Sequence, residues 1–146
     1  MFSKQEATQL RKEFWTVLGK YLHPVPSASG ELCNWINYKT GVKFIRFHMQ
    51  ADEIRTTIAI ELDHKDAESR NIALQKFKLL QNELNELPGE WKWQKDETQE
   101  MDVYISQLAS MHILRKSDWP VMISFFKMAI TALDKFWFNN SEIFES

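Results

Sequence analysis

The stretch over residues 34–63 alternates apolar and polar side chains, and this alternation strongly constrains the fold. Successive side chains of a β-strand point to opposite faces, so a period of two indicates strands with one covered face. Turn-forming residues interrupt the alternation at Thr40-Gly41 and Asp52-Glu53. We therefore predict three antiparallel strands, at residues 34–38, 42–51 and 54–63.

A two-residue turn fixes which residues of neighbouring strands lie opposite each other. Around Asp52-Glu53, this rule places Phe47 opposite Ile58. The same register sorts the apolar residues onto one face, which another part of the chain must cover. The predicted covered face consists of Ile36, Tyr38, Ile45, Phe47, Met49, Ile54, Ile58, Ile60 and Leu62.

The opposite face of this predicted sheet is mixed in character. It places Trp35 beside Arg46 and Phe44 beside Glu61 as cross-strand neighbours. Guanidinium groups suit phosphate, and an indole next to one offers a stacking surface. We therefore take this face as the candidate for ligand contact. Its candidate residues are Trp35, Arg46, His48, Arg55, Thr57 and Glu61.

Three helices are predicted around the strands. The first covers residues 3–21, where Ser3 and Glu6 form a capping box. The second covers residues 66–87 and ends at Pro88-Gly89. The third opens within residues 117–120, closes at residues 139–140 and carries a wide apolar stripe, which is typical of a buried or interface helix.

Two further strands, at residues 90–95 and 103–110, are expected to pair as a long-looped hairpin. The order is then α-βββ-α-ββ-α, so we predict one α+β domain over residues 1–146 with a mostly antiparallel sheet. This order is similar to that of the restriction-endonuclease-like core. The similarity is one of element order, and a shared fold does not determine function.

Composition narrows the class of protein. The net charge of −2 argues against a general polyanion binder and leaves room only for a local basic patch. Cys33 is the single cysteine, so no internal disulfide forms and a reducing compartment is expected. The start of the chain lacks the pattern of a signal peptide, and no apolar run is long enough to span a membrane. We expect a cytoplasmic protein.

The restriction-endonuclease-like order calls for a test of nuclease chemistry, which needs carboxylates converging on a metal ion. Asp52 and Asp63, followed by Lys65, have a superficially suitable pattern. The prediction places the two aspartates at opposite ends of one strand, roughly 36 Å apart at about 3.3 Å per residue, so they cannot share an ion. The four histidines also lack metal-ligand spacing. We expect no catalytic, metal or cofactor site.

Three segments carry a resemblance to a known family. They are residues 10–15 (LRKEFW), residues 34–43 (NWINYKTGVK), and the aromatic positions of residues 118–137. Together they resemble an uncharacterised bacterial family, domain of unknown function 4268. Members occur as free-standing small proteins and as a domain C-terminal to a nuclease-like domain. The resemblance therefore implies DNA-related work or defence, and it supplies no catalytic residues.

Three functions remain open from the sequence. The first is a non-catalytic binding module for nucleic acid or for a nucleic-acid-processing partner, using the mixed face. The second is a protein-interaction or homodimer-forming domain that uses the aromatic last helix. The third is a divergent phosphodiesterase-like enzyme. Positive charge on the mixed face favours the first, an exposed apolar patch the second, and convergent carboxylates the third.

Overall fold

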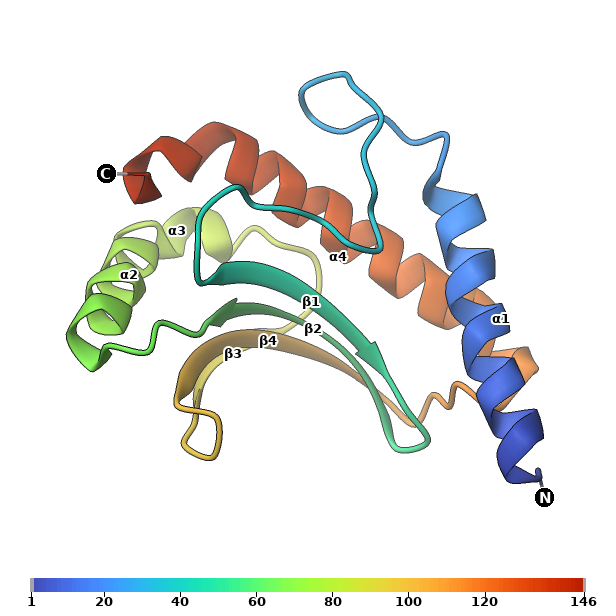
Figure 1. Ribbon diagram of the computed structural model, residues 1–146. Coiled ribbons are helices and arrows are strands. Elements are labelled where there is room, and N and C mark those ends of the chain that lie inside the picture. Colours follow the sequence, from blue (N-terminus) through green and yellow to red (C-terminus); the bar gives the residue numbers. More distant parts are fainter. Residues whose placement is uncertain (1, 146) are drawn as a thin grey trace.

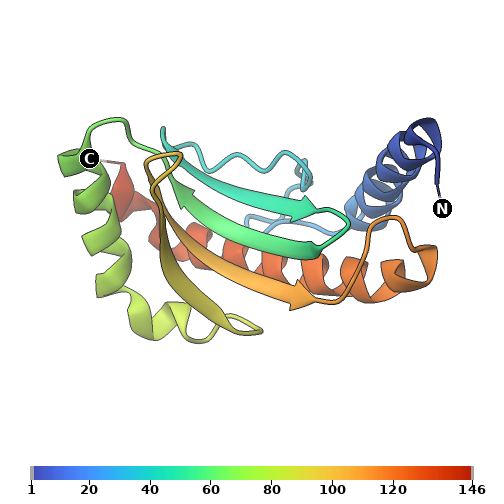
Figure 2. The same ribbon diagram turned by 90° about the horizontal axis from the view of Figure 1, so that it is seen from below.

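The computed structural model describes residues 2–145 and shows an α+β fold (Figure 1). A four-stranded antiparallel sheet has the strand order β1-β2-β4-β3. Its strands arch, and α4 crosses the convex side in both ribbon views (Figures 1 and 2). The strands are β1 (Ile45–Ala51), β2 (Arg55–Leu62), β3 (Trp91–Asp96) and β4 (Met101–Ala109). The helices are α1 (Lys4–Leu22), α2 (Ala67–Leu79), α3 (Gln81–Leu84) and α4 (Trp119–Asn140), with short 3-10 turns η1 (Lys116–Asp118) and η2 (Ser141–Phe144).

The prediction of a strand at residues 34–38 is wrong. Residues 35–37 form a bend and turn in a long loop, and the sheet begins only at Ile45. The reason lies in Trp35, whose indole N–H donates to the carbonyl of Val25 at 3.0 Å while its ring stacks on Tyr38. The Trp35 side chain is only 2% exposed. An indole in the core buries more apolar area than one on an open sheet face, and here it also keeps a hydrogen-bond partner.

The connection between β1 and β2 comprises residues 52–54, in place of the predicted two-residue turn at Asp52-Glu53. The carboxylate of Asp52 accepts hydrogen bonds from the backbone N–H groups of Ile54 and Arg55, at 2.7 and 2.8 Å. This side-chain turn lengthens the loop. Phe47 consequently lies opposite Ile60, two residues from the predicted partner. A shift of two keeps every strand residue on its predicted face, whereas a shift of one would have reversed them.

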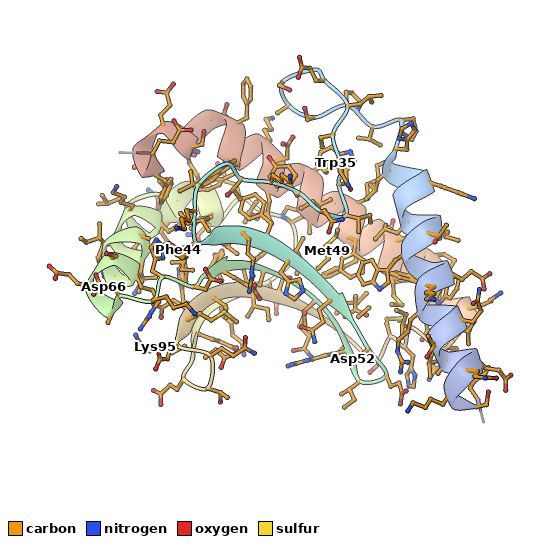
Figure 3. The ribbon with its side chains drawn as sticks, viewed as in Figure 1. Trp35, Phe44, Met49, Asp52, Asp66 and Lys95 are labelled. Atoms are coloured by element: carbon orange, nitrogen blue, oxygen red, sulfur yellow. The ribbon has the colours of Figure 1, made fainter. Side chains whose placement is uncertain are left out.

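The core lies between the convex side of the sheet and the helices. Ile58 and Ile60 are fully buried there, and Phe47 meets Trp137 of α4 edge to face. Figure 3 shows Met49 on the same side of β1 as α4. Ile54 alone departs strongly from the predicted covered face, because it sits in the longer hairpin loop and is 81% exposed.

Helix prediction succeeded except at one point. The capping box of Ser3 and Glu6 is present at the start of α1. The predicted helix over residues 66–87 is broken at Leu80 into α2 and α3. At the break, the Gln81 side chain accepts from the indole N–H of Trp93 and donates to the hydroxyl of Tyr104. These contacts join α3 to the sheet, and they account for a break that local sequence does not signal.

Candidate ligand-binding face

The concave side of the sheet is the candidate site, because none of the elements described over residues 2–145 crosses it in Figures 1 and 2. Strand register assigns its residues row by row. One row runs from His48 through Ala59 and Ile105 to Lys92. The concave face comprises Arg46, His48 and Gln50 of β1, Arg55, Thr57, Ala59 and Glu61 of β2, Met101, Val103, Ile105, Gln107 and Ala109 of β4, and Lys92, Gln94 and Asp96 of β3.

Glu61 is the central acid of this face. Its side chain is 8% exposed although none of the described helices covers it, because Arg46 and His48 lie over it with half-exposed side chains. Arg46 Nε donates to Glu61 Oε1 at 2.6 Å, and His48 Nδ1 lies 3.0 Å from Glu61 Oε2. Both carboxylate oxygens therefore have a partner. A terminal nitrogen of Arg46 also lies 3.6 Å from Asp63.

The pKa values of Glu61 and His48 are shifted in opposite directions. Burial by itself would raise the pKa of Glu61, but hydrogen bonds from His48 and Arg46 bring that pKa below its ordinary value. The hydrogen bond to Glu61 raises the pKa of His48, against the effects of burial and of Arg46. The ionised carboxylate can only accept, so His48 Nδ1 carries a hydrogen and donates it to Glu61.

Five of the six residues that the sequence suggested for ligand contact do lie on the concave face. Trp35 does not, because its ring is buried on the convex side among the loop and helix residues, as the position of its label in Figure 3 shows. Phe44 also leaves the sheet, since its φ of 69° ends the strand pattern, and it packs against His64. The concave residues in the paired rows include no Phe, Tyr or Trp, so these rows provide no platform for base stacking.

The sequence did not reveal the half of the face that β3 and β4 contribute. A groove of about 690 Å³ lies there, extending round the edge of β3. Its concave-face residues are Arg55, Lys92, Gln94, Ile105 and Gln107. The β2–β4 pairing that brings these residues onto the face joins positions 40 to 54 residues apart, and it leaves no local signal in the sequence.

Other candidate features have structural partners. Asp52 caps the hairpin turn and Asp63 lies beside Arg46, so each of these aspartates has a role outside metal binding. Over residues 2–145, no three His, Cys, Asp or Glu side chains are grouped so as to hold a metal ion. None of the helices in the same range is long and apolar enough to cross a membrane.

A second hollow, of about 920 Å³, lies between the loop after α1 and the C-terminal half of α4. Its buried acid, Asp134, accepts from the hydroxyl of Tyr38 at 2.6 Å and from the backbone N–H of Ala28 at 2.7 Å. Burial and this carboxylate raise the pKa of the Tyr38 phenol. The acid therefore ties the loop to the helix.

The last helix leaves apolar side chains at the surface, with Val121 at 47%, Met128 at 57% and Phe138 at 58% exposure. Isolated apolar residues of this kind are common on protein surfaces. Homodimerisation through α4 stays a prediction.

Comparisons with known proteins identify the family of the chain. No curated protein and no solved structure matches it. A family model described as "Domain of unknown function (DUF4268)" matches residues 10–141, which include every strand, all of α4 and most of α1. The chain therefore belongs to the DUF4268 family of domains of unknown function.

Proposed function

We propose that this protein is a nucleic-acid-binding module whose concave face holds the phosphodiester backbone of a single strand. The observation that supports this is an uncovered, arched sheet face with cationic and amide donors around an apolar floor. The floor consists of Ala59, Met101, Val103 and Ile105. The donors surrounding it are Arg46, His48, Gln50, Arg55, Lys92, Gln94 and Gln107.

The charges of the face favour a modest, local contact. Arg55 and Lys92 are exposed, and neither has an ion-pair partner within residues 2–145. Arg46 is paired with Glu61, yet 54% of its side chain is exposed and its terminal nitrogens can still approach a phosphate. His48 and Lys92 lie at opposite ends of one row, about 14 Å apart across three strand spacings. That width suits one extended strand.

The test measures fluorescence anisotropy of a labelled single-stranded oligonucleotide at low and moderate salt. Binding should weaken as salt rises, because phosphate contacts release counterions. The double variant Arg55→Ala, Lys92→Ala should bind more weakly and flatten the plot of log K against log[salt] by about 1.4, or about 0.7 per lost contact. It leaves the Arg46–Glu61–His48 cluster intact, so loss of folding is not expected.

The matched control removes two exposed lysines from α1, as Lys12→Ala, Lys20→Ala, and changes the net charge by the same amount. Its salt dependence should equal that of the wild type. Absence of binding at low salt, or equal weakening in both double variants, would remove the concave face as the site. The protein-interaction function would then be the leading explanation.

A further inference from the structure

The Arg46–Glu61–His48 cluster has a geometry that a simple surface ion pair does not require. Glu61 uses both carboxylate oxygens, one for Arg46 Nε and one for His48 Nδ1. With Nδ1 committed to Glu61, the other ring nitrogen of His48, Nε2, is the one that can exchange a proton with a ligand. The His48 side chain is 49% exposed on the uncovered concave face, so a bound strand can reach it.

The surroundings of His48 restrict what it can activate. In its row lie Ala59 and Ile105, and the hydroxyl-bearing neighbour Thr57 is only 4% exposed. These neighbouring side chains therefore supply no nucleophile, which leaves water or the substrate. Among nucleic acids, RNA carries a nucleophile, the 2′-hydroxyl, next to each phosphodiester. A nucleophile that is attached to the substrate in this way has a high effective concentration.

We propose that this cluster cleaves RNA bound on the concave face by transphosphorylation. His48 Nε2 accepts the proton of the 2′-hydroxyl as O2′ attacks phosphorus. The P–O2′ bond forms, the P–O5′ bond breaks, and the proton passes from Nε2 to the departing O5′. The products are a 2′,3′-cyclic phosphate and a 5′-hydroxyl, so atoms and charge balance without a co-reactant. This inference rests on the proposed function, because the strand must first bind to this face.

The two charged partners of His48 have distinct parts in this step. The terminal nitrogens of Arg46 lie at the surface and stabilise the charge that develops on the non-bridging phosphate oxygens. Glu61 acts as a positioning residue, because it orients the imidazole and stabilises the imidazolium that forms in mid-reaction. The charged side chains that share the concave face with His48 include Arg46 on β1, Glu61 on β2 and Lys92 on β3. The β4 residue in the row of His48 is the apolar Ile105.

The experiment uses two labelled oligonucleotides of one sequence, an all-deoxy strand and a strand with a single ribonucleotide. Each is incubated with the full chain in buffer containing a chelator, and products are separated on a denaturing gel and weighed by mass spectrometry. Cleavage is expected only at the ribonucleotide, with a cyclic phosphate terminus. His48→Gln should lower the rate roughly 10²-fold or more, which is the usual contribution of general acid–base catalysis.

Controls separate this activity from contamination and from loss of folding. His23→Gln, which removes an exposed histidine from the loop after α1, should cleave as the wild type does after identical purification. Glu61→Gln should cleave more slowly and with a pH–rate profile shifted to lower pH, since His48 would lose its anionic partner. A purely structural role for Glu61 would lower the rate without moving that profile.

Anisotropy of the all-deoxy strand reports binding independently of cleavage. Binding of that strand together with an uncut ribonucleotide strand would overturn the cleavage proposal and leave the binding function standing. Cleavage unchanged in His48→Gln would also overturn it. Failure of the all-deoxy strand to bind contradicts the proposed function itself.

Discussion

At the scale of single residues, the ionised carboxylate of Glu61 is almost inaccessible to solvent. Its side chain is 8% exposed, and hydrogen bonds from Arg46 and His48 account for its remaining ionised. The raised pKa of His48 means that the pair contributes stability below the ordinary histidine pKa of 6.5 and loses that contribution as pH rises through the folded-state value. The lowered pKa of Glu61 means that its contribution is present above 4.5 and is lost as pH falls through the folded-state value.

Glu61→Gln should therefore destabilise the protein most between about pH 4.5 and 6.5, where both charges of the pair are present. The expected cost there is about 1 kcal/mol, because solvent screens the two half-exposed partners. Urea unfolding at pH 4, 5.5 and 8 measures the difference from wild type. A difference that grows steadily from pH 5.5 to 8 would contradict the assigned pairing.

Ile58→Ala tests the covered face, because Ile58 is fully buried between the sheet and the helices. Removing its side chain should lower the free energy of unfolding by about 2–5 kcal/mol, as large-to-small core changes do. Ile54→Ala is the matched control, since Ile54 is 81% exposed in the hairpin loop and should change stability by roughly 0.5 kcal/mol or less. Equal losses in the two variants would show that the assignment of faces is wrong.

At the scale of elements, local rules predicted what local contacts decide. The capping box of Ser3 and Glu6 marks α1, and alternation places β1 and β2 with their faces correct. The failures occur where distant residues intervene. The segment around Trp35 alternates like a strand, yet a hydrogen bond to Val25 and packing in the core outweigh strand propensity. The break at Leu80 likewise depends on contacts of Gln81 with β3 and β4.

Asp134→Asn tests the tie between the loop after α1 and α4. The neutral amide can still accept from the Ala28 N–H and can donate to the Tyr38 hydroxyl oxygen, so two hydrogen bonds to a charged group become weaker neutral ones. The expected cost is about 1–3 kcal/mol. Hydrogen exchange followed by mass spectrometry should show faster exchange at residues 24–44 and unchanged exchange in β2 and β4.

Lys135→Ala is the control for this change, because Lys135 is exposed on the neighbouring position of α4. It should leave exchange in the loop at the wild-type rate. Faster exchange spread evenly over the sheet in Asp134→Asn would mean that the acid supports the whole fold and not this loop in particular.

At the scale of the whole molecule, the sequence predicted half of the candidate face. Alternation in β1 and β2 placed Arg46, His48 and Glu61 on one side, and the structure shows that they touch. The other half comes from β3 and β4, whose pairing with β2 connects remote parts of the chain. Its groove, with Lys92, depends on tertiary arrangement and has no counterpart in a local pattern.

The whole molecule should show no metal-dependent cleavage of DNA. Asp52 is engaged in the hairpin turn and Asp63 lies beside Arg46 at the other end of β2, so these carboxylates do not converge. Plasmid DNA incubated with the pure protein and Mg²⁺ or Mn²⁺ should remain supercoiled on an agarose gel. Cleavage that disappears in Asp63→Ala would refute this expectation.

The loop after α1 has a consequence for the order in which the chain folds during synthesis. Its hydrogen bonds to Asp134 and Trp137 join residues 106, 96 and 97 positions apart. Contacts of such long sequence separation form late, since the intervening chain must close first. While the ribosome is still making α4, residues 24–44 lack the hydrogen-bond partners that this helix supplies. This early segment therefore stays open to chaperones and proteases until the last helix emerges.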